Sequence, residues 1–252
     1  MKIHEYQSRQ LLAAAGVPVP PAEMVQTVAE AVAAHQKIGG RVVVKAQVFA
    51  GGRGKAGFVK LCDTPEQTRA AAQFMLSNKM VSKQTGPQGV PVNRLLVAGA
   101  VDIEREYYVG MVVDRARRCP VMMVSREGGV EIEEVAARNP DAIVKEWLHP
   151  HLGLQPYQVR KLTQALGFTA PEHIKEATKV FQGLADAFLK CDASLAEINP
   201  LVITKASPKP GDSSSPSPES RAPNPGSLLA IDAKINFDDN ALFRHPDIEA
   251  MH

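Results

Sequence analysis

The sequence has few cysteines, little net charge and no long apolar run, and each of these absences excludes a class of protein. Only three cysteines occur among 252 residues, widely spaced and odd in number, so neither a disulfide framework nor a C-x-x-C metal pair is predicted. We expect free thiols in a reducing compartment. The formal net charge of +2 offers no electrostatic footprint for nucleic acid or for an anionic membrane.

Signals for export, membrane insertion and histidine chemistry are also lacking. Residues 1–7 do not form the apolar core of a signal peptide, and no stretch approaches the ~20 apolar residues of a membrane-spanning helix. We therefore expect a cytoplasmic protein. None of the seven histidines lies beside a Ser or Cys nucleophile motif or in H-x-x-x-H spacing. The chain is not expected to supply a catalytic nucleophile of its own.

What the sequence does contain is a mixture of helix and strand patterns. Capping signals and closing glycines predict helices over residues 5–15, 27–38, 64–76, 156–166 and 171–190. β-Branched and apolar runs predict strands over residues 42–48, 58–62, 92–98, 104–113, 120–124, 142–145, 195–204 and 228–234. Because the order lacks regular β-α-β repetition, we expect an α+β protein with two layered subdomains.

One segment, residues 206–226, departs from this pattern because it is rich in Ser and Pro. It cannot bury enough apolar surface to offset the entropy of ordering, so we expect a disordered hairpin tip. Such tips tolerate insertions, which favours a neutral insertion over a binding role.

A glycine-rich segment, GGRGKAG at residues 51–57, follows the predicted strand that carries Lys45. Four glycines in seven residues let backbone N–H groups approach an anion closely, and Arg53 and Lys55 add positive charge. A flap of this kind can hold a polyphosphate, although the segment matches neither the Walker nor the dinucleotide-binding pattern. The alternative is a tight turn with a solvated basic tip.

A possible metal site lies near the end of the sequence. Strand alternation puts Glu197 and Asn199 on one face, and Asp232 can sit beside Asn199 if the two predicted strands are hairpin neighbours. Mg²⁺ typically takes one or two carboxylate or amide oxygens together with phosphate and water. The alternative is an Asn-Pro turn signal and an ordinary exposed aspartate.

Glu106 is a further candidate, because it shares a predicted strand face with Glu104. Either carboxylate can accept hydrogen bonds from a ribose. A solvated sheet edge explains the same spacing, and spacing alone favours that reading.

Together these segments occur in an order that resembles the beta subunit of ADP-forming succinate–CoA ligases. The matching segments cover nearly the whole chain: residues 3–7, 11–12, 16–18, 44–47, 50–57, 82–85, 127–133, 197–201, 232–234 and 239–244. The resemblance implies an ATP-grasp fold, in which two α+β subdomains enclose a nucleotide cleft. It places residues 1–22 and 103–245 in a larger subdomain, residues 23–102 in a smaller subdomain with the glycine flap, and residues 246–252 in a truncated tail.

The same resemblance implies which residues contact ATP. It implies that the flap and the strand before it bind the phosphates, and that two residues later in the sequence contact the rest of the nucleotide. The residues implied are Lys45, Gly52, Arg53 and Gly54 for the phosphates, and Val101 and Glu106 for the rest of the nucleotide.

The resemblance also implies the reaction. Asn199 and Asp232 would bind Mg²⁺, and Glu197 would stabilise a phosphohistidine that belongs to a partner alpha subunit. The expected activity is the phosphoryl transfer between ATP and that histidine within succinate + CoA + ATP = succinyl-CoA + ADP + phosphate, a step of the tricarboxylic acid cycle. Positioning and charge neutralisation are what such a transfer requires of the protein.

Three departures from the family pattern leave alternatives open. Ala98 stands where the family usually has a glutamate near the adenine, and Phe58 stands where it usually has a flap glycine. The chain also stops at His252, before the flavodoxin-like domain that joins the alpha subunit in the family. The alternatives are a non-catalytic nucleotide-binding remnant and a malate–CoA ligase beta subunit. We expect ATP rather than GTP as the nucleotide.

Overall fold

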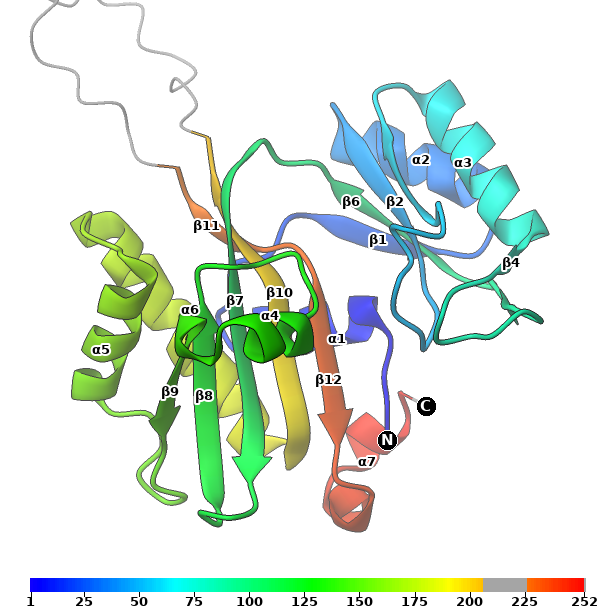
Figure 1. Ribbon diagram of the computed structural model, residues 1–252. Helices are drawn as coiled ribbons and strands as arrows, with labels where there is room; N and C mark the ends of the chain where they lie inside the picture. The colour runs from blue at the N-terminus through cyan, green and yellow to red at the C-terminus, as the bar shows by residue number, and fades with distance from the viewer. Residues whose placement is uncertain (206–225, 252) are drawn as a thin grey trace, which may run out of the picture. The chain divides into compact units, whose positions relative to one another are not determined.

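The computed structural model describes residues 1–205 and 226–251 (Figure 1). The predicted disordered tip at residues 206–226 therefore lies outside the described residues, except for Gly226. Contacts among Cα atoms divide the chain into two units. The glycine-loop unit comprises Met1–Leu11, Val19–Val101 and Ala233–His252, and the long-sheet unit comprises Leu12–Pro18 and Asp102–Asp232.

These units differ from the expected subdomains at the two ends of the chain. The segments 1–11 and 233–252 pack with the glycine loop, whereas the resemblance places most of them in the other subdomain. The boundary between residues 101 and 102 lies next to the expected one. Contacts define packing units rather than the subdomains of a family, so the subdomain assignment stays a prediction.

The glycine-loop unit is built on an antiparallel sheet with the strand order β1-β6-β2-β3. Residues of β2, among them Val42 and Val44, are fully buried in one core cluster with Ala72 and Met75 of the helix α3. The elements of this unit are α1 (Glu5–Ala14), β1 (Ala22–Val25), α2 (Val28–Ile38), β2 (Val42–Ala46), β3 (Val59–Cys62), α3 (Pro65–Ser77), β4 (Lys79–Met80), β5 (Val90–Pro91), β6 (Leu95–Gly99), β12 (Ala233–Phe237), η2 (Asp239–Arg244) and α7 (Pro246–Glu249). The strand pair β2–β3 presents the glycine loop.

Two helices of this unit begin where the sequence predicts them. The Thr27 side chain accepts a hydrogen bond from the Glu30 N–H, and the Glu30 side chain accepts one from Thr27, which completes the capping box of α2. In α3 the Thr64 hydroxyl accepts from the Gln67 N–H at 3.3 Å. Local capping therefore sets both helix starts.

The long-sheet unit contains an antiparallel sheet with the strand path β11-β10-β7-β8-β9. Helices α5 and α6 pack against it (Figure 1). The elements are β7 (Ile103–Asp114), β8 (Cys119–Ser125), α4 (Ile132–Arg138), η1 (Pro140–Ala142), β9 (Ile143–Trp147), α5 (Pro156–Leu166), α6 (Pro171–Lys190), β10 (Ala193–Thr204) and β11 (Leu228–Ala230). The long strands β7 and β10 lie side by side in its middle.

Helix α6 packs so closely against its neighbours that position 183 accepts only a glycine. A Cβ on Gly183 would lie 2.7 Å from the carbonyl oxygen of Ala15, which leaves no room for a side chain. On the same helix Phe181 and Leu184 are fully buried. Helix α6 therefore supplies the apolar layer under the sheet that carries the candidate site residues of this unit.

The structure also shows where the sequence patterns fail. The single strand predicted at residues 228–234 is wrong, because the chain forms β11 and then a separate strand, β12. Strand β1 and helix α4 were not predicted. Strand β1 has only four residues, and α4 lacks a side-chain cap at Glu131, so neither carries a strong local signal.

Two further features are the cysteines and the lengths of the helices. Within the described residues, Cys62, Cys119 and Cys191 form no disulfide bond. Among the helices in the described ranges, none is long and apolar enough to cross a membrane.

A matched pair of leucine substitutions tests the packing of the long-sheet unit. Leu184→Ala should lower the free energy of unfolding by about 2–5 kcal/mol, because it opens a cavity under the sheet. Leu152→Ala should change it by about 0.5 kcal/mol or less, since that side chain is 67% exposed. Denaturant titration measures both values, and equal losses would show that α6 is not part of the core.

Candidate functional site

The glycine loop joins β2 to β3 and is folded on itself. The N–H groups of Ala56, Gly57 and Phe58 donate to the carbonyl oxygens of Gly52, Gly54 and Arg53 at 3.0, 3.1 and 2.9 Å. Gly52 and Gly57 have φ of +80° and +78°, a conformation that side chains disfavour. These two glycines let a short loop reverse its direction between adjacent strands.

The far end of the loop is fixed in the core. Phe58 is 3% exposed and its ring lies 5.4 Å from that of Phe74. The sequence predicts that a phenylalanine at this position stiffens or reshapes the hinge, and its burial gives the loop an anchor at β3. Ala98 of β6 is also buried, opposite Val43 and Ala22 in the sheet.

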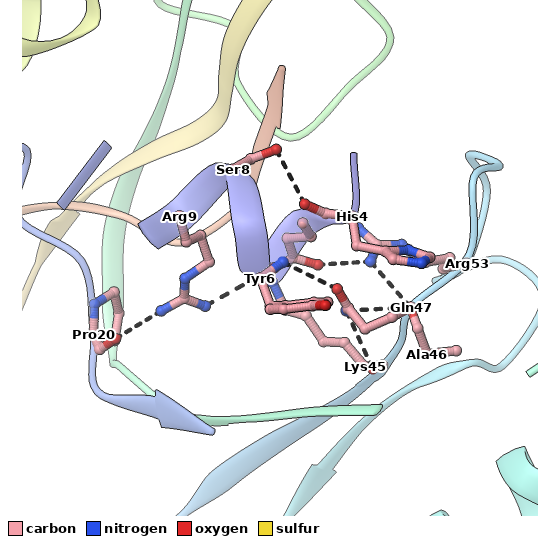
Figure 2. A network of polar contacts seen from close by, with 10 residues as sticks. His4, Tyr6, Ser8, Arg9, Pro20, Lys45, Ala46, Gln47 and Arg53 are labelled. Carbon is pink, nitrogen blue, oxygen red and sulfur yellow. Dashed lines mark hydrogen bonds and ion pairs between the residues drawn. The ribbon is translucent and has the colours of Figure 1, made fainter. Parts of the chain in front are cut away.

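Both predicted phosphate-binding cations contact one buried carboxylate, that of Glu5. Lys45 Nζ donates to Glu5 Oε1 at 2.8 Å, and Arg53 Nη1 donates to Oε2 at 2.6 Å. Arg9, one helical turn after Glu5 on α1, places Nη1 3.9 Å from Oε1. Lys45 from β2, Arg53 from the loop and Arg9 from α1 thus converge (Figure 2).

The positive charges around Glu5 lower the pKa of its carboxyl group. Burial by itself raises the pKa, but Lys45 and Arg53 together lower it more strongly, from 4.5 to about 2. The carboxylate is therefore ionised at neutral pH although its side chain is only 3% exposed. Sequence reasoning missed Glu5, because nothing local marks it: its partners lie 40 and 48 positions away.

The residues on either side of Glu5 hold the start of the loop. The His4 ring stacks on that of Phe49 with centroids 4.1 Å apart, and the Tyr6 N–H donates to Gln47 Oε1 at 3.1 Å. Burial and the charges of Arg94 and Arg53 lower the pKa of His4 to about 4, so its imidazole is neutral at neutral pH. The segment 4–6 thus binds the loop as well as the two cations.

In the long-sheet unit, Asn199 of β10 is at the centre of the second candidate cluster. Its Nδ2 donates to Glu197 Oε1 at 3.2 Å and to the Val130 carbonyl at 2.9 Å, and its Oδ1 accepts from the Gly129 N–H at 2.8 Å. The backbone N–H of Asn199 donates to the Asp232 carbonyl at 3.2 Å. The structure therefore brings Glu197, Asn199 and Asp232 together, as strand alternation and hairpin pairing predict.

The turn at Gly128 and Gly129 presses this cluster against β7. A Cβ on Gly128 would lie 2.4 Å from the Tyr107 nitrogen, and a Cβ on Gly129 would lie 2.3 Å from Glu106 Oε2. Gly129 also has φ of +72°. The Tyr107 backbone leaves no room for a side chain at position 128, the positive φ favours glycine at position 129, and the Glu106 carboxylate lies beside the turn.

Tyr108 lies near the same carboxylates. Burial raises the pKa of its hydroxyl, and the charges of Glu197 and Glu133 raise it further. The hydroxyl therefore stays protonated and can act only as a neutral hydrogen-bonding group.

Glu106 also lines a pocket of about 330 Å³ in the long-sheet unit. Its other lining residues are Arg105, Tyr107, Arg126, Leu166 and Gly167. Arg105, Glu106 and Arg126 make its lining mostly charged.

The predicted site residues thus fall into two groups. The first group lies in the glycine-loop unit. It comprises four residues of the loop and its strand, Lys45, Gly52, Arg53 and Gly54, together with Val101, which ends the segment Val19–Val101 of that unit. The other group, in the long-sheet unit, comprises Glu106, Glu197, Asn199 and Asp232. That both groups face one cleft stays a prediction.

The oxygen atoms near Asn199 are chemically suited to Mg²⁺, which prefers amide and carboxylate oxygens with water and phosphate. The Asn199 Oδ1 accepts one hydrogen bond, and an amide oxygen has a second lone pair. Within the described residues, no group of three or more His, Cys, Asp or Glu side chains could hold a metal ion by itself.

Comparison with known proteins places this geometry in a family. Residues 2–203 match the family model for the ATP-grasp domain, which confirms the predicted fold class. The succinate–CoA ligase [ADP-forming] beta subunit of Geobacillus kaustophilus is 48% identical over 250 residues, covering 98% of this chain and 59% of that protein. The GDP-forming beta subunit of Thermus thermophilus is 44% identical over 251 residues, covering 100% and 59%. The chain thus spans about three fifths of the length of these relatives.

Solved structures show the same fold at low sequence identity. A protein of Pyrococcus horikoshii Ot3 has a TM-score of 0.68 and 20% identity, covering 94% of this chain and 92% of that one. A dinucleotide-forming acetyl-coenzyme A synthetase 1 of Ca. Korarchaeum cryptofilum, in complex with coenzyme A and Ca-AMPCP, has a TM-score of 0.66 and 17% identity over 94% and 93%.

A substitution at Gly128 tests the turn that supports Asn199. Gly128→Ala should lower the free energy of unfolding by about 1–3 kcal/mol, because the new methyl group overlaps the Tyr107 backbone. Gly54→Ala is the control, since a Cβ there meets nothing within 4 Å. Denaturant titration distinguishes the two, and a Gly128→Ala protein as stable as the control would mean that the turn does not lie against β7.

The pH dependence of stability tests the Glu5 cluster. Because the folded-state pKa of Glu5 lies below its ordinary value, its stabilisation is complete above about pH 4.5 and is lost as the pH falls toward 2. Glu5→Gln should cost about 3–5 kcal/mol at neutral pH, because it leaves buried cations unpaired. The difference from the unsubstituted chain, measured by urea titration at several pH values, should shrink only below about pH 5. A difference that shrinks already near neutral pH would contradict the assigned pKa.

Proposed function

The chain belongs to the ATP-grasp family and is similar over almost its whole length to succinate–CoA ligase beta subunits, and we propose that it binds ATP for phosphoryl transfer to a histidine of a partner alpha subunit. The overall reaction would be succinate + CoA + ATP = succinyl-CoA + ADP + phosphate. The alpha subunit as partner, ATP as the nucleotide and a cytoplasmic location are parts of this proposal.

The observation that carries the proposal is the pair of cations held at the glycine loop. Lys45 and Arg53 reach the same carboxylate from the strand and from the loop, so their charged ends are close together. Two adjacent cations beside a glycine-rich backbone suit a polyphosphate, which offers several anionic oxygens in a row. Gly52, Arg53 and Gly54 would add backbone N–H groups, while Val101 and Glu106 would contact the rest of the nucleotide.

Asn199 and Asp232 would hold Mg²⁺. The ion would supply positive charge that offsets the negative charge of the phosphates. Asn199 is suited to this role because its amide is fixed by the Gly129 N–H and by the Val130 carbonyl. A ligand oxygen that is held in place before the metal arrives loses little conformational freedom on binding.

Glu197 would stabilise the incoming histidine. It accepts a hydrogen bond from Asn199, which places its carboxylate beside the proposed metal ligand. A carboxylate can accept a hydrogen bond from one ring N–H of an imidazole, so that the other ring nitrogen is unprotonated and oriented to receive the phosphoryl group. Tyr108 supports this placement, since the Glu197 charge acts on its hydroxyl.

A second candidate is a non-catalytic nucleotide-binding protein. The observation that favours it is Ala98, whose buried methyl group cannot accept the hydrogen bond that a glutamate would. The two candidates differ in turnover, not in fold.

Transfer of a labelled phosphoryl group tests the proposed function. With Mg²⁺ and γ-labelled ATP, a cognate alpha subunit mixed with the 252-residue chain and with the separately produced C-terminal domain of a related beta subunit should become labelled on a histidine. Absence of label while ATP still binds would favour the non-catalytic candidate. Glu197→Gln serves as the internal control, because it should slow labelling without removing ATP binding.

A lysine substitution tests the phosphate contact. Lys45→Ala should weaken ATP binding by about 1.5–3 kcal/mol, the size of a charge-assisted hydrogen bond to phosphate. Lys79→Ala, an exposed lysine in the same unit, should leave the affinity unchanged. Calorimetric titration measures both, and equal affinities in the two variants would remove Lys45 from the site.

A further inference from the structure

We infer that Glu5 is a positioning residue for the nucleotide, acting through Lys45 and Arg53, whose charged groups it sets at a fixed spacing before a polyphosphate binds. The inference rests on the proposed function, because it concerns the same two cations. No sequence motif for phosphate binding includes this carboxylate, which precedes the loop by more than 40 residues.

The geometry of one carboxylate determines the spacing. Lys45 contacts Oε1 at 2.8 Å and Arg53 contacts Oε2 at 2.6 Å, so each oxygen binds a different cation. Both oxygens belong to one rigid planar group. The ammonium and the guanidinium are therefore held next to each other, as two neighbouring phosphate oxygens would require.

The carboxylate itself cannot move far. Glu5 is the first residue of α1, where the helix dipole favours a negative charge, and its side chain is 3% exposed. Arg9 lies one turn further along the helix, within 3.9 Å of Oε1, and its Nη2 donates to the Pro20 carbonyl at 2.7 Å. The Glu5 carboxylate is thus held by its own helix and, through Arg9, by the carbonyl group of Pro20.

Arg53 shows how the anchor reaches the loop. The same Nη1 that contacts Glu5 also donates to the Ala46 carbonyl at 3.1 Å, at the end of β2. Lys45 precedes that carbonyl by one residue. The tip of the glycine loop is therefore tied back to the strand that carries the lysine.

This preorganisation has a consequence for affinity. Lysine and arginine have many rotamers, and fixing them when a ligand binds costs conformational entropy. In this protein the carboxylate restricts both side chains beforehand. Removing it should therefore weaken the binding of ATP, although Glu5 itself need not touch the nucleotide.

Three variants and a double substitution test this inference in the 252-residue chain. Glu5→Gln removes the charge, Glu5→Asp keeps it on a shorter side chain, and Glu23→Gln is the matched control, an ion-pair partner of Lys37 in the same unit. Calorimetric titration with Mg-ATP gives each dissociation constant. We expect at least a tenfold increase for Glu5→Gln, a smaller increase for Glu5→Asp and no change for Glu23→Gln.

A double-mutant cycle separates positioning from general stability. In a Lys45→Ala background, Glu5→Gln should raise the dissociation constant by less than in the unsubstituted chain, because the route through Lys45 is already gone and only Arg53 is left to position. An equal increase in both backgrounds would contradict positioning through Lys45 and overturn the inference. Unchanged or tighter ATP binding in folded Glu5→Gln would also overturn the inference.

Folding and function are checked separately. Circular dichroism reports whether each variant is folded, and if Glu5→Gln is not, Glu5→Asp in the two backgrounds carries the same comparison. If the unsubstituted chain fails to bind Mg-ATP, the proposed function fails. If that chain binds and Glu5→Asp is indistinguishable from Glu23→Gln, only the inference on Glu5 fails.

Discussion

The ion pairs between the buried Glu5 carboxylate and the cations Lys45 and Arg53 constrain the glycine loop more than any local signal does. A charge in a protein interior is tolerated only when it is paired and hydrogen-bonded. Each loop conformation that separates Arg53 from Glu5 therefore removes one of the ion pairs that stabilise the buried carboxylate. The same contacts keep two cations at the base of a loop whose glycines suit an anion.

In the long-sheet unit, neutral hydrogen bonds fix the position of the Asn199 side chain. Both ends of the Asn199 amide are fixed, Oδ1 by the Gly129 N–H and Nδ2 by the Val130 carbonyl. The turn that provides these groups has glycine at two consecutive positions, at Gly128 because of its approach to the β7 backbone and at Gly129 because of its positive φ. In each unit, then, a polar side chain with a proposed role in binding is held by residues distant in the sequence.

The sequence predicts the parts of this structure that depend on local signals. Thr27 with Glu30 and Thr64 with Pro65 mark helix starts, and the glycine hairpin follows from β-branched strands around a glycine run. The separation of β11 from β12 was not predicted, because the break between them, Ile231-Asp232, contains neither glycine nor proline. Likewise the neighbours of Glu5 and Gly129 depend on tertiary packing, which no local pattern encodes. The roles of Val101 and Glu106 came from family resemblance alone.

The most direct measurement of the central claim is a crystal structure of the chain with Mg²⁺ and a non-hydrolysable ATP analogue. We predict that Lys45 Nζ and the Arg53 guanidinium contact phosphate oxygens while Glu5 remains within hydrogen-bonding distance of both. We also predict that the metal is bound by Asn199 and Asp232. A triphosphate bound elsewhere, with Lys45 and Arg53 contacting only Glu5, would contradict the proposed site.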